Sequence, residues 1–139
     1  MLQSIGFAAA YTGVGIALLV LGFYALDVLT PGHLGRQIAE ERSVNAAVVL
    51  ASGFLAQGMV VFAAIWTNAT SGFGVALLWT VVFGVVGVVL QAVAFLALDL
   101  LIPGKLGAHL VEVRFHPASL VFAAVQLAVG AIVVASIWP

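Results

Sequence analysis

The sequence predicts an all-α membrane protein: a bundle of four transmembrane helices made of two tandem, parallel two-helix repeats. Three observations predict it, namely four long apolar segments, charged side chains confined to two windows, and a match between the two halves of the chain. Of 139 residues, 65% are hydrophobic and 6% are charged, whereas a soluble domain has about 25% charged residues. A surface that faces lipid needs no charged groups, so this composition fits hydrocarbon as the solvent.

The four expected spans each reach the length that crosses a bilayer, which is about 20 apolar residues for a core about 30 Å thick. They are residues 5–29, 44–66, 73–102 and 117–138. Pro31-Gly32 and Pro103-Gly104 end the first and third spans, because proline clashes with the preceding helical turn and glycine lets the chain turn. A polar turn at residues 68–72 separates the second span from the third. The first unit is then residues 1–70 and the second is residues 71–139.

Every Asp, Glu, Lys, Arg and His side chain lies in one of two windows, and each window joins the helices of one unit. These residues are Asp27, His33, Arg36, Glu40, Glu41 and Arg42, followed by Asp99, Lys105, His109, Glu112, Arg114 and His116. Short loops that carry Lys and Arg stay in the cytoplasm. We therefore expect loops 30–43 and 103–116 to be cytoplasmic and both termini to lie outside.

An apolar pair recurs four positions apart within each window, Leu34/Ile38 in the first and Leu106/Leu110 in the second. This spacing fits one face of a short helix that lies along the inner headgroups of the bilayer. A plain charged turn that only fixes the topology explains the windows equally well.

The two halves of the chain match without a gap at an offset of 72 positions, which places residues 23–35 over residues 95–107. The matched pairs include Asp27/Asp99, Pro31/Pro103, Glu40/Glu112 and Arg42/Arg114. Because each unit crosses the bilayer twice, the second unit starts in the same orientation as the first. We expect a parallel repeat about a pseudo-two-fold axis along the membrane normal, with like helices opposite one another in the bundle.

A further pattern joins these features: a helix that ends in Asp-x-x-x-Pro-Gly, a short charged loop, and Asn45-Ala46-Ala47-Val48 at the start of the next helix. In this pattern the chain resembles, over nearly its whole length, the bacterial domain-of-unknown-function 350 family. The resemblance implies a multi-pass protein of the bacterial inner (plasma) membrane, often built of two such units, and implies no activity. The second unit departs from the pattern, since His116-Pro117 replaces Val44-Asn45. A functional role of Asn45 would therefore belong to the first unit alone.

Asp27 and Asp99 are matched acids near the cytoplasmic ends of their spans. A carboxylate there faces the negative end of the helix dipole and needs a partner. In the structural interpretation, which we favour, each acid accepts hydrogen bonds from the turn before Pro31 or Pro103, or pairs with an arginine. The candidate arginines are Arg36, Arg42 and Arg114. In the functional interpretation, the two acids flank the inner mouth of a pathway for cations or protons.

Four amide side chains are candidates for polar contacts between helices. They are Asn45, Gln57, Gln91 and Gln126. Amides in hydrocarbon seek partners on neighbouring helices, and each such bond contributes roughly 0.6–2 kcal/mol. The alternative is that they line a narrow pore.

The sequence favours neither catalysis nor a cofactor. His33, His109 and His116 are expected to be solvated loop residues and not metal ligands, because their spacing matches no familiar zinc motif. The sequence contains no recognisable pattern of a nucleophile with a general base, so we do not expect the protein to be an enzyme. Cysteine is absent, which excludes disulfides and thiol chemistry. Four basic residues are too few to form a positively charged surface that binds nucleic acid.

Two functional hypotheses remain. The first is a self-associating structural or accessory membrane subunit whose charged cytoplasmic face docks a membrane or cytoplasmic protein. Abundant small residues in the spans, which allow helices to approach closely, favour a homo-oligomer in the lipid bilayer. The second is a small channel or transporter for ions or small solutes, with Asp27 and Asp99 at its inner mouth.

Overall fold

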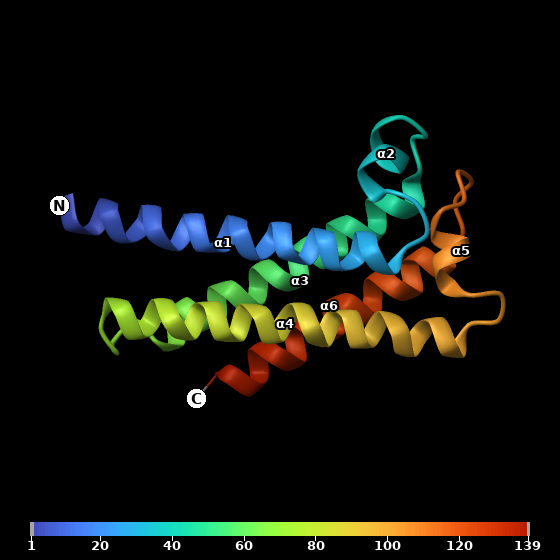
Figure 1. The fold of residues 1–139 in the computed structure, drawn as a ribbon. Coiled ribbons are helices and arrows are strands. Elements are labelled where there is room, and N and C mark those ends of the chain that lie inside the picture. The colour runs from blue at the N-terminus through green and yellow to red at the C-terminus, as the bar shows by residue number, and fades with distance from the viewer. Residues whose placement is uncertain (1, 139) are drawn as a thin grey trace.

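The computed structural model describes residues 2–138, and these residues form helices and no strand (Figure 1). The four long helices are α1 (Leu2–Leu29), α3 (Val44–Thr67), α4 (Phe73–Leu101) and α6 (Ala118–Ile137). Each is long and apolar enough to cross a membrane. Two short helices, α2 (Leu34–Ala39) and α5 (Leu106–Leu110), lie in the charged windows. The predicted all-α fold with four apolar helices is confirmed, and its boundaries differ from the expected ones by a few residues.

Glycines open the turns at both kinds of helix junction. Gly32 and Gly104 follow the prolines that end α1 and α4, and their φ angles are 86° and 92°. Gly72 precedes α4 with a φ of 85°. Side chains other than hydrogen are strained in this left-handed region, so glycine at these positions lets the chain leave one helix and enter the next.

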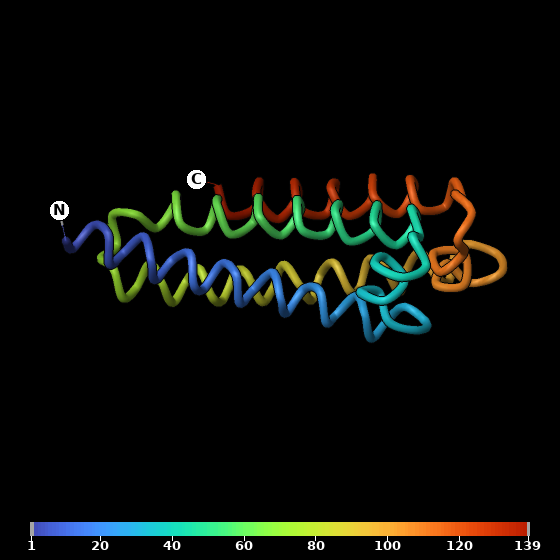
Figure 2. Tube along the Cα trace, turned by 90° about the horizontal axis from the view of Figure 1, so that it is seen from above, coloured from blue at the N-terminus to red at the C-terminus, as the bar shows by residue number. Residues whose placement is uncertain are grey.

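The long helices run in two directions and the charged windows gather at one end. α1 and α4 run the same way, and α3 and α6 run the opposite way (Figure 1). Seen from above, α3 and α6 lie side by side in one layer, with α1 and α4 in the other (Figure 2). The short helices α2 and α5 lie together at one end, whereas the start of α1 and the α3–α4 turn lie at the other. Charge is therefore separated along the length of the bundle.

The closest helix pair is α3 with α6, which differs from the expectation that like helices lie opposite one another. Small residues permit this contact: a Cβ atom added to Gly130 of α6 would lie 2.8 Å from the Cβ of Ala56 in α3. α4 also packs against α3, but α1 makes no comparable interface with α6. A two-fold axis along the bundle would require both interfaces, so this pair departs from the expected pseudo-two-fold arrangement. α1 packs against α3 as α4 packs against α6, which agrees with that arrangement.

The short helices pack onto the end of the bundle through their leucine side chains. Leu34 of α2 and Leu106 and Leu110 of α5 are fully buried. They close a core around Phe95 and Phe122, whose rings meet edge to face at 5.3 Å. The helical interpretation of the windows is therefore correct, but the apolar face of each short helix points into the protein.

Candidate functional site

The two aspartates hold the starts of the short helices. At the end of α1, Asp27 Oδ1 accepts a hydrogen bond of 2.6 Å from the backbone N–H of Leu34, the first residue of α2. Near the end of α4, Asp99 Oδ1 accepts one of 3.1 Å from the backbone N–H of Gly107 in α5. These N–H groups have no partner within their own helices, because the first turn of a helix leaves its donors free. Each carboxylate thus ties the end of a span to the following short helix.

The partners of the acids differ from those expected. The bonded backbone follows the Pro-Gly turn and does not precede it. The second oxygen of Asp27, Oδ2, lies 3.5 Å from Nδ1 of His33. Among residues 2–138 no arginine forms an ion pair with either acid, and Arg36 instead lies 3.8 Å from Glu41. Arg42 adopts a left-handed backbone with φ of 53°, while Arg114 contributes its carbonyl oxygen to the contact described next.

Asn45, at the start of α3, joins this helix to the loop between α5 and α6. Its side chain is fully buried. Its Nδ2 donates to the carbonyl oxygens of Glu112, at 2.8 Å, and Arg114, at 2.7 Å. Its Oδ1 accepts from the backbone N–H of His116 at 2.8 Å. All of these partners lie in the second charged window, so one amide of the first unit fixes the loop of the second.

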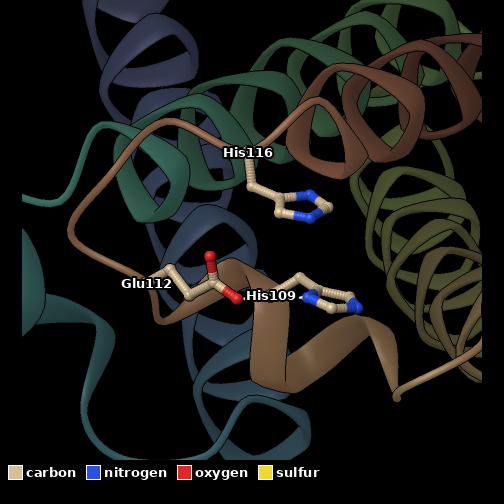
Figure 3. A group of neighbouring side chains, drawn as sticks. All are labelled: His109, Glu112 and His116. Carbon is tan, nitrogen blue, oxygen red and sulfur yellow. Dashed lines mark hydrogen bonds and ion pairs between the residues drawn. The ribbon is translucent and has the colours of Figure 1, made fainter.

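This loop brings His109, Glu112 and His116 together (Figure 3). Nδ1 of His109 lies 3.2 Å from a carboxylate oxygen of Glu112, and Nε2 lies 3.2 Å from the carbonyl oxygen of Pro103. The hydrogen bond to Glu112, and next the one to Pro103, raise the pKa of His109 above its usual value. The ring of His116 stacks on that of His109 with centroids 4.3 Å apart.

Of the three histidines expected to be solvated, His33 is exposed, whereas His109 and His116 are half-buried. The exposed fraction of the side chain is 77% for His33 and 24% for His109. The sequence did contain a signal for the cluster, since the residues fall in the order His-x-x-Glu-x-x-x-His. Without the fold, nothing indicated that the chain between them turns back and stacks the two imidazoles.

The amides of the spans form one interhelical contact and leave one side chain without a partner. Gln57 of α3 donates from Nε2 to the carbonyl oxygen of Gly84 in α4, at 2.8 Å. Gln91 of α4 donates to Oε1 of Gln57 at 3.1 Å. Gln126 of α6 is fully buried, and neither its Oε1 nor its Nε2 has a hydrogen-bond partner among the described residues.

Comparison with known proteins agrees with this architecture. The family model described as "Domain of Unknown Function (DUF350)" matches residues 1–137. The chain belongs to this family. It is also 42% identical to a "UPF0719 transmembrane protein" of Mycolicibacterium paratuberculosis over 127 residues, which cover 91% of this chain and 83% of the relative. UPF0719 transmembrane proteins of Mycobacterium bovis and Mycobacterium tuberculosis are 34% identical over the same shares.

The relatives are named transmembrane proteins, in agreement with the four helices of this chain that are long and apolar enough to cross a membrane. Both findings are consistent with a multi-pass membrane protein. The names of the relatives describe a transmembrane protein and no activity. No solved structure matches the chain. The arrangement of Asp27, Asp99, Asn45 and the histidine cluster is therefore the starting point for any assignment of function.

Proposed function

We propose that the protein is a self-associating structural or accessory subunit of the bacterial inner membrane, whose charged end faces the cytoplasm and docks a protein partner. The observation that carries the proposal is that both aspartates are bonded to the backbone of the short helices. Acids in membrane helices are functional candidates by default. An acid that ties two elements together has a structural role instead, and its bonded oxygen is less free to bind a passing ion.

The burial of Asp27 supports the same assignment. Its side chain is 16% exposed, and its two oxygens face Leu34 N–H and the ring of His33. A cation at this site would compete with both groups. The acid therefore suits an anchor for α2 better than an entrance to a pathway.

The distribution of basic residues supports a cytoplasmic position for the charged end. Arg36, Arg42, Lys105 and Arg114 all lie in the two windows, and the α3–α4 turn carries no basic residue. Loops rich in Lys and Arg are retained in the cytoplasm. Several of these side chains are exposed, so the end of the bundle offers charges of both signs to a protein partner.

The poor packing of α1 supports self-association. Only Leu18 and Leu26 of this 28-residue helix are buried. Nothing lies within 4 Å of the position that a Cβ atom would occupy on Gly6 or Gly13. Small residues on a free face let a second membrane helix approach closely, which strengthens van der Waals contact between helices. We therefore place a second copy of the chain, in preference to lipid alone, against α1.

A specific observation favours the alternative of a small channel or transporter. Gln126 is fully buried without a hydrogen-bond partner in residues 2–138. A buried amide without a partner costs about 1–3 kcal/mol. Water or a solute that passes through the bundle would offset this cost by bonding to the amide of Gln126. Gln57 of α3 and Gln91 of α4 would supply further polar groups to such a pathway.

Two measurements separate these functions. Copies of the chain with different epitope tags, expressed together, should co-purify in mild detergent, and a variant with Gly13→Leu should reduce that recovery.

In liposomes we expect no ion or solute flux above that of protein-free vesicles. If the wild-type protein gives flux and the double variant with Asp27→Asn and Asp99→Asn gives none, the subunit assignment is overturned in favour of the channel. Asparagine keeps an acceptor oxygen for Leu34 and Gly107, so this double variant is expected to fold.

A further inference from the structure

α5 and the loop that follows it bring together three side chains of the types that bind metal ions in proteins. His109 lies in α5, Glu112 just after it, and His116 just before α6 (Figure 3). One potential ligand atom from each lies within 4.8 Å of the others. The cluster includes neither of the aspartates described above, and the proposed function does not use it.

His109 faces a hydrogen-bond acceptor at each of its two ring nitrogens. The carbonyl oxygen of Pro103, 3.2 Å from Nε2, and the carboxylate of Glu112, 3.2 Å from Nδ1, can both only accept. A neutral ring has a single N–H, so it can donate to one of these acceptors and presents a lone pair to the other. A metal ion between Nδ1 and the carboxylate of Glu112 would satisfy both of these groups, while Nε2 keeps its proton and donates to Pro103.

The first charged window shows what the fold alone requires at these positions. At the offset of 72, Gln37 corresponds to His109 and Val44 to His116. Gln37 Nε2 donates to the carbonyl oxygen of Pro31 at 2.9 Å, which is the same contact that His109 makes with Pro103. A glutamine therefore satisfies the structural need for a donor. That need explains neither the histidine at position 109 nor the second imidazole stacked on it.

The loop is held in place before any ligand binds. Asn45 bonds the backbone of Glu112 and His116, and Ser43 donates to the carbonyl oxygen of Glu112 at 3.1 Å. Backbone held in this way positions the ligand side chains at little entropic cost. Nδ1 of His116 accepts from the backbone N–H of Ala118, at 3.1 Å. Coordination through Nε2 of His116 would leave this bond intact, whereas coordination through Nδ1 would release the N–H of Ala118 in the first turn of α6.

We infer that His109, Glu112 and His116 form a binding site for a divalent transition-metal ion, with Zn²⁺ as the ion whose chemistry fits best. Two imidazoles and one carboxylate are ligands that zinc prefers, whereas calcium and magnesium prefer oxygen ligands alone. Zinc binds such atoms at about 2.0–2.2 Å. The three ligand atoms, which lie within 4.8 Å of one another, would therefore move closer together by side-chain rotation when the ion binds. The proton of His109 Nε2, held by Pro103, orients the ring as an outer-shell partner does in metal sites. This site revises the sequence-based expectation that the histidines bind no metal.

The test is zinc binding by the whole protein, purified in detergent with a tag that contains no histidine. We expect one Zn²⁺ per chain by equilibrium dialysis and metal analysis. His109→Gln keeps the donor to Pro103, as Gln37 does in the first window, and removes one ligand. It should weaken zinc binding by more than about 100-fold, since loss of even an outer-shell partner costs about 10–100-fold. His116→Val and Glu112→Gln should also weaken it.

His33→Gln is the matched control, because His33 is the histidine of the other window and lies outside the cluster. Its zinc affinity should equal that of the wild type. The inference is overturned if the wild-type protein binds no zinc, or if His109→Gln and His116→Val bind it as tightly as the wild type. An equal loss in His33→Gln would also overturn it, since zinc would then bind scattered surface histidines. Zinc should raise the thermal unfolding temperature of the wild type but not that of the variants, and circular dichroism verifies that each variant folds.

Discussion

At the scale of single residues, the charged end of the bundle depends on a few polar side chains that bond to backbone groups. Asp27, Asp99 and Asn45 each connect two helical segments in this way. Backbone groups in short loops lack the partners that a long helix supplies, and leaving them unpaired when buried costs free energy. Asn45 differs from the aspartates because it has no counterpart in the second unit, where position 117 is a proline.

Asn45→Ala should therefore destabilise the protein. The change leaves the carbonyl oxygen of Arg114 and the N–H of His116 without this partner, while the carbonyl oxygen of Glu112 keeps only the hydrogen bond from Ser43. We expect the free energy of unfolding in detergent to fall by about 2 kcal/mol or more, since each buried group left unpaired costs about 1–3 kcal/mol. Chemical unfolding followed by circular dichroism measures this difference.

Asn68→Ala is the control for that prediction. Within residues 2–138, the side chain of Asn68 bonds to its own helix end, to the carbonyl oxygen of Ala64 and to the hydroxyl of Thr67. Its loss should cost clearly less than the loss of Asn45. If the two alanine variants unfold alike, Asn45 does not hold the loop of the second unit.

At the scale of helices, the contact between α3 and α6 organises the bundle. Without a hydrophobic driving force between helices in lipid, their association depends on close packing. Gly130 of α6 meets Ala56 of α3 at this interface, and the atoms nearest to an added Cβ on Gly130 include backbone atoms of Ala56. Backbone atoms cannot rotate away as a side chain can. The interface therefore has no room for a single methyl group at this position.

Gly130→Ala should force α3 and α6 apart. We expect a loss of about 1–3 kcal/mol in the free energy of unfolding, which is the usual cost of overpacking. Gly58→Ala is the matched control, because Gly58 lies 72 positions earlier and an added Cβ there meets nothing within 4 Å. It should leave stability unchanged or raise it slightly, as alanine favours helix over glycine. Equal changes in stability for the two variants would show that the α3–α6 contact at Gly130 does not decide the outcome.

At the scale of the whole molecule, the spans were predictable and the contacts between them were not. Apolar length and the Pro-Gly turns determine where the helices run, because both act locally. The burial of Leu34 and Leu106, and the choice of α6 as the neighbour of α3, depend on shape complementarity between distant segments. The histidine cluster was missed for a similar reason: Asn45, which holds its loop, bonds to His116 from 71 positions away.

The orientation of the whole protein in the membrane can be tested with single cysteines, since the chain contains none. Ser71 in the α3–α4 turn and Ala108 in α5 are both exposed and lie at opposite ends of the bundle. With the basic loops in the cytoplasm, a membrane-impermeant maleimide added to intact cells should label Ser71→Cys and leave Ala108→Cys unlabelled. Permeabilised cells should give labelling of both, which verifies that each thiol is reachable. Labelling of Ala108→Cys from outside intact cells would place the charged end, and with it the histidine cluster, on the outer side.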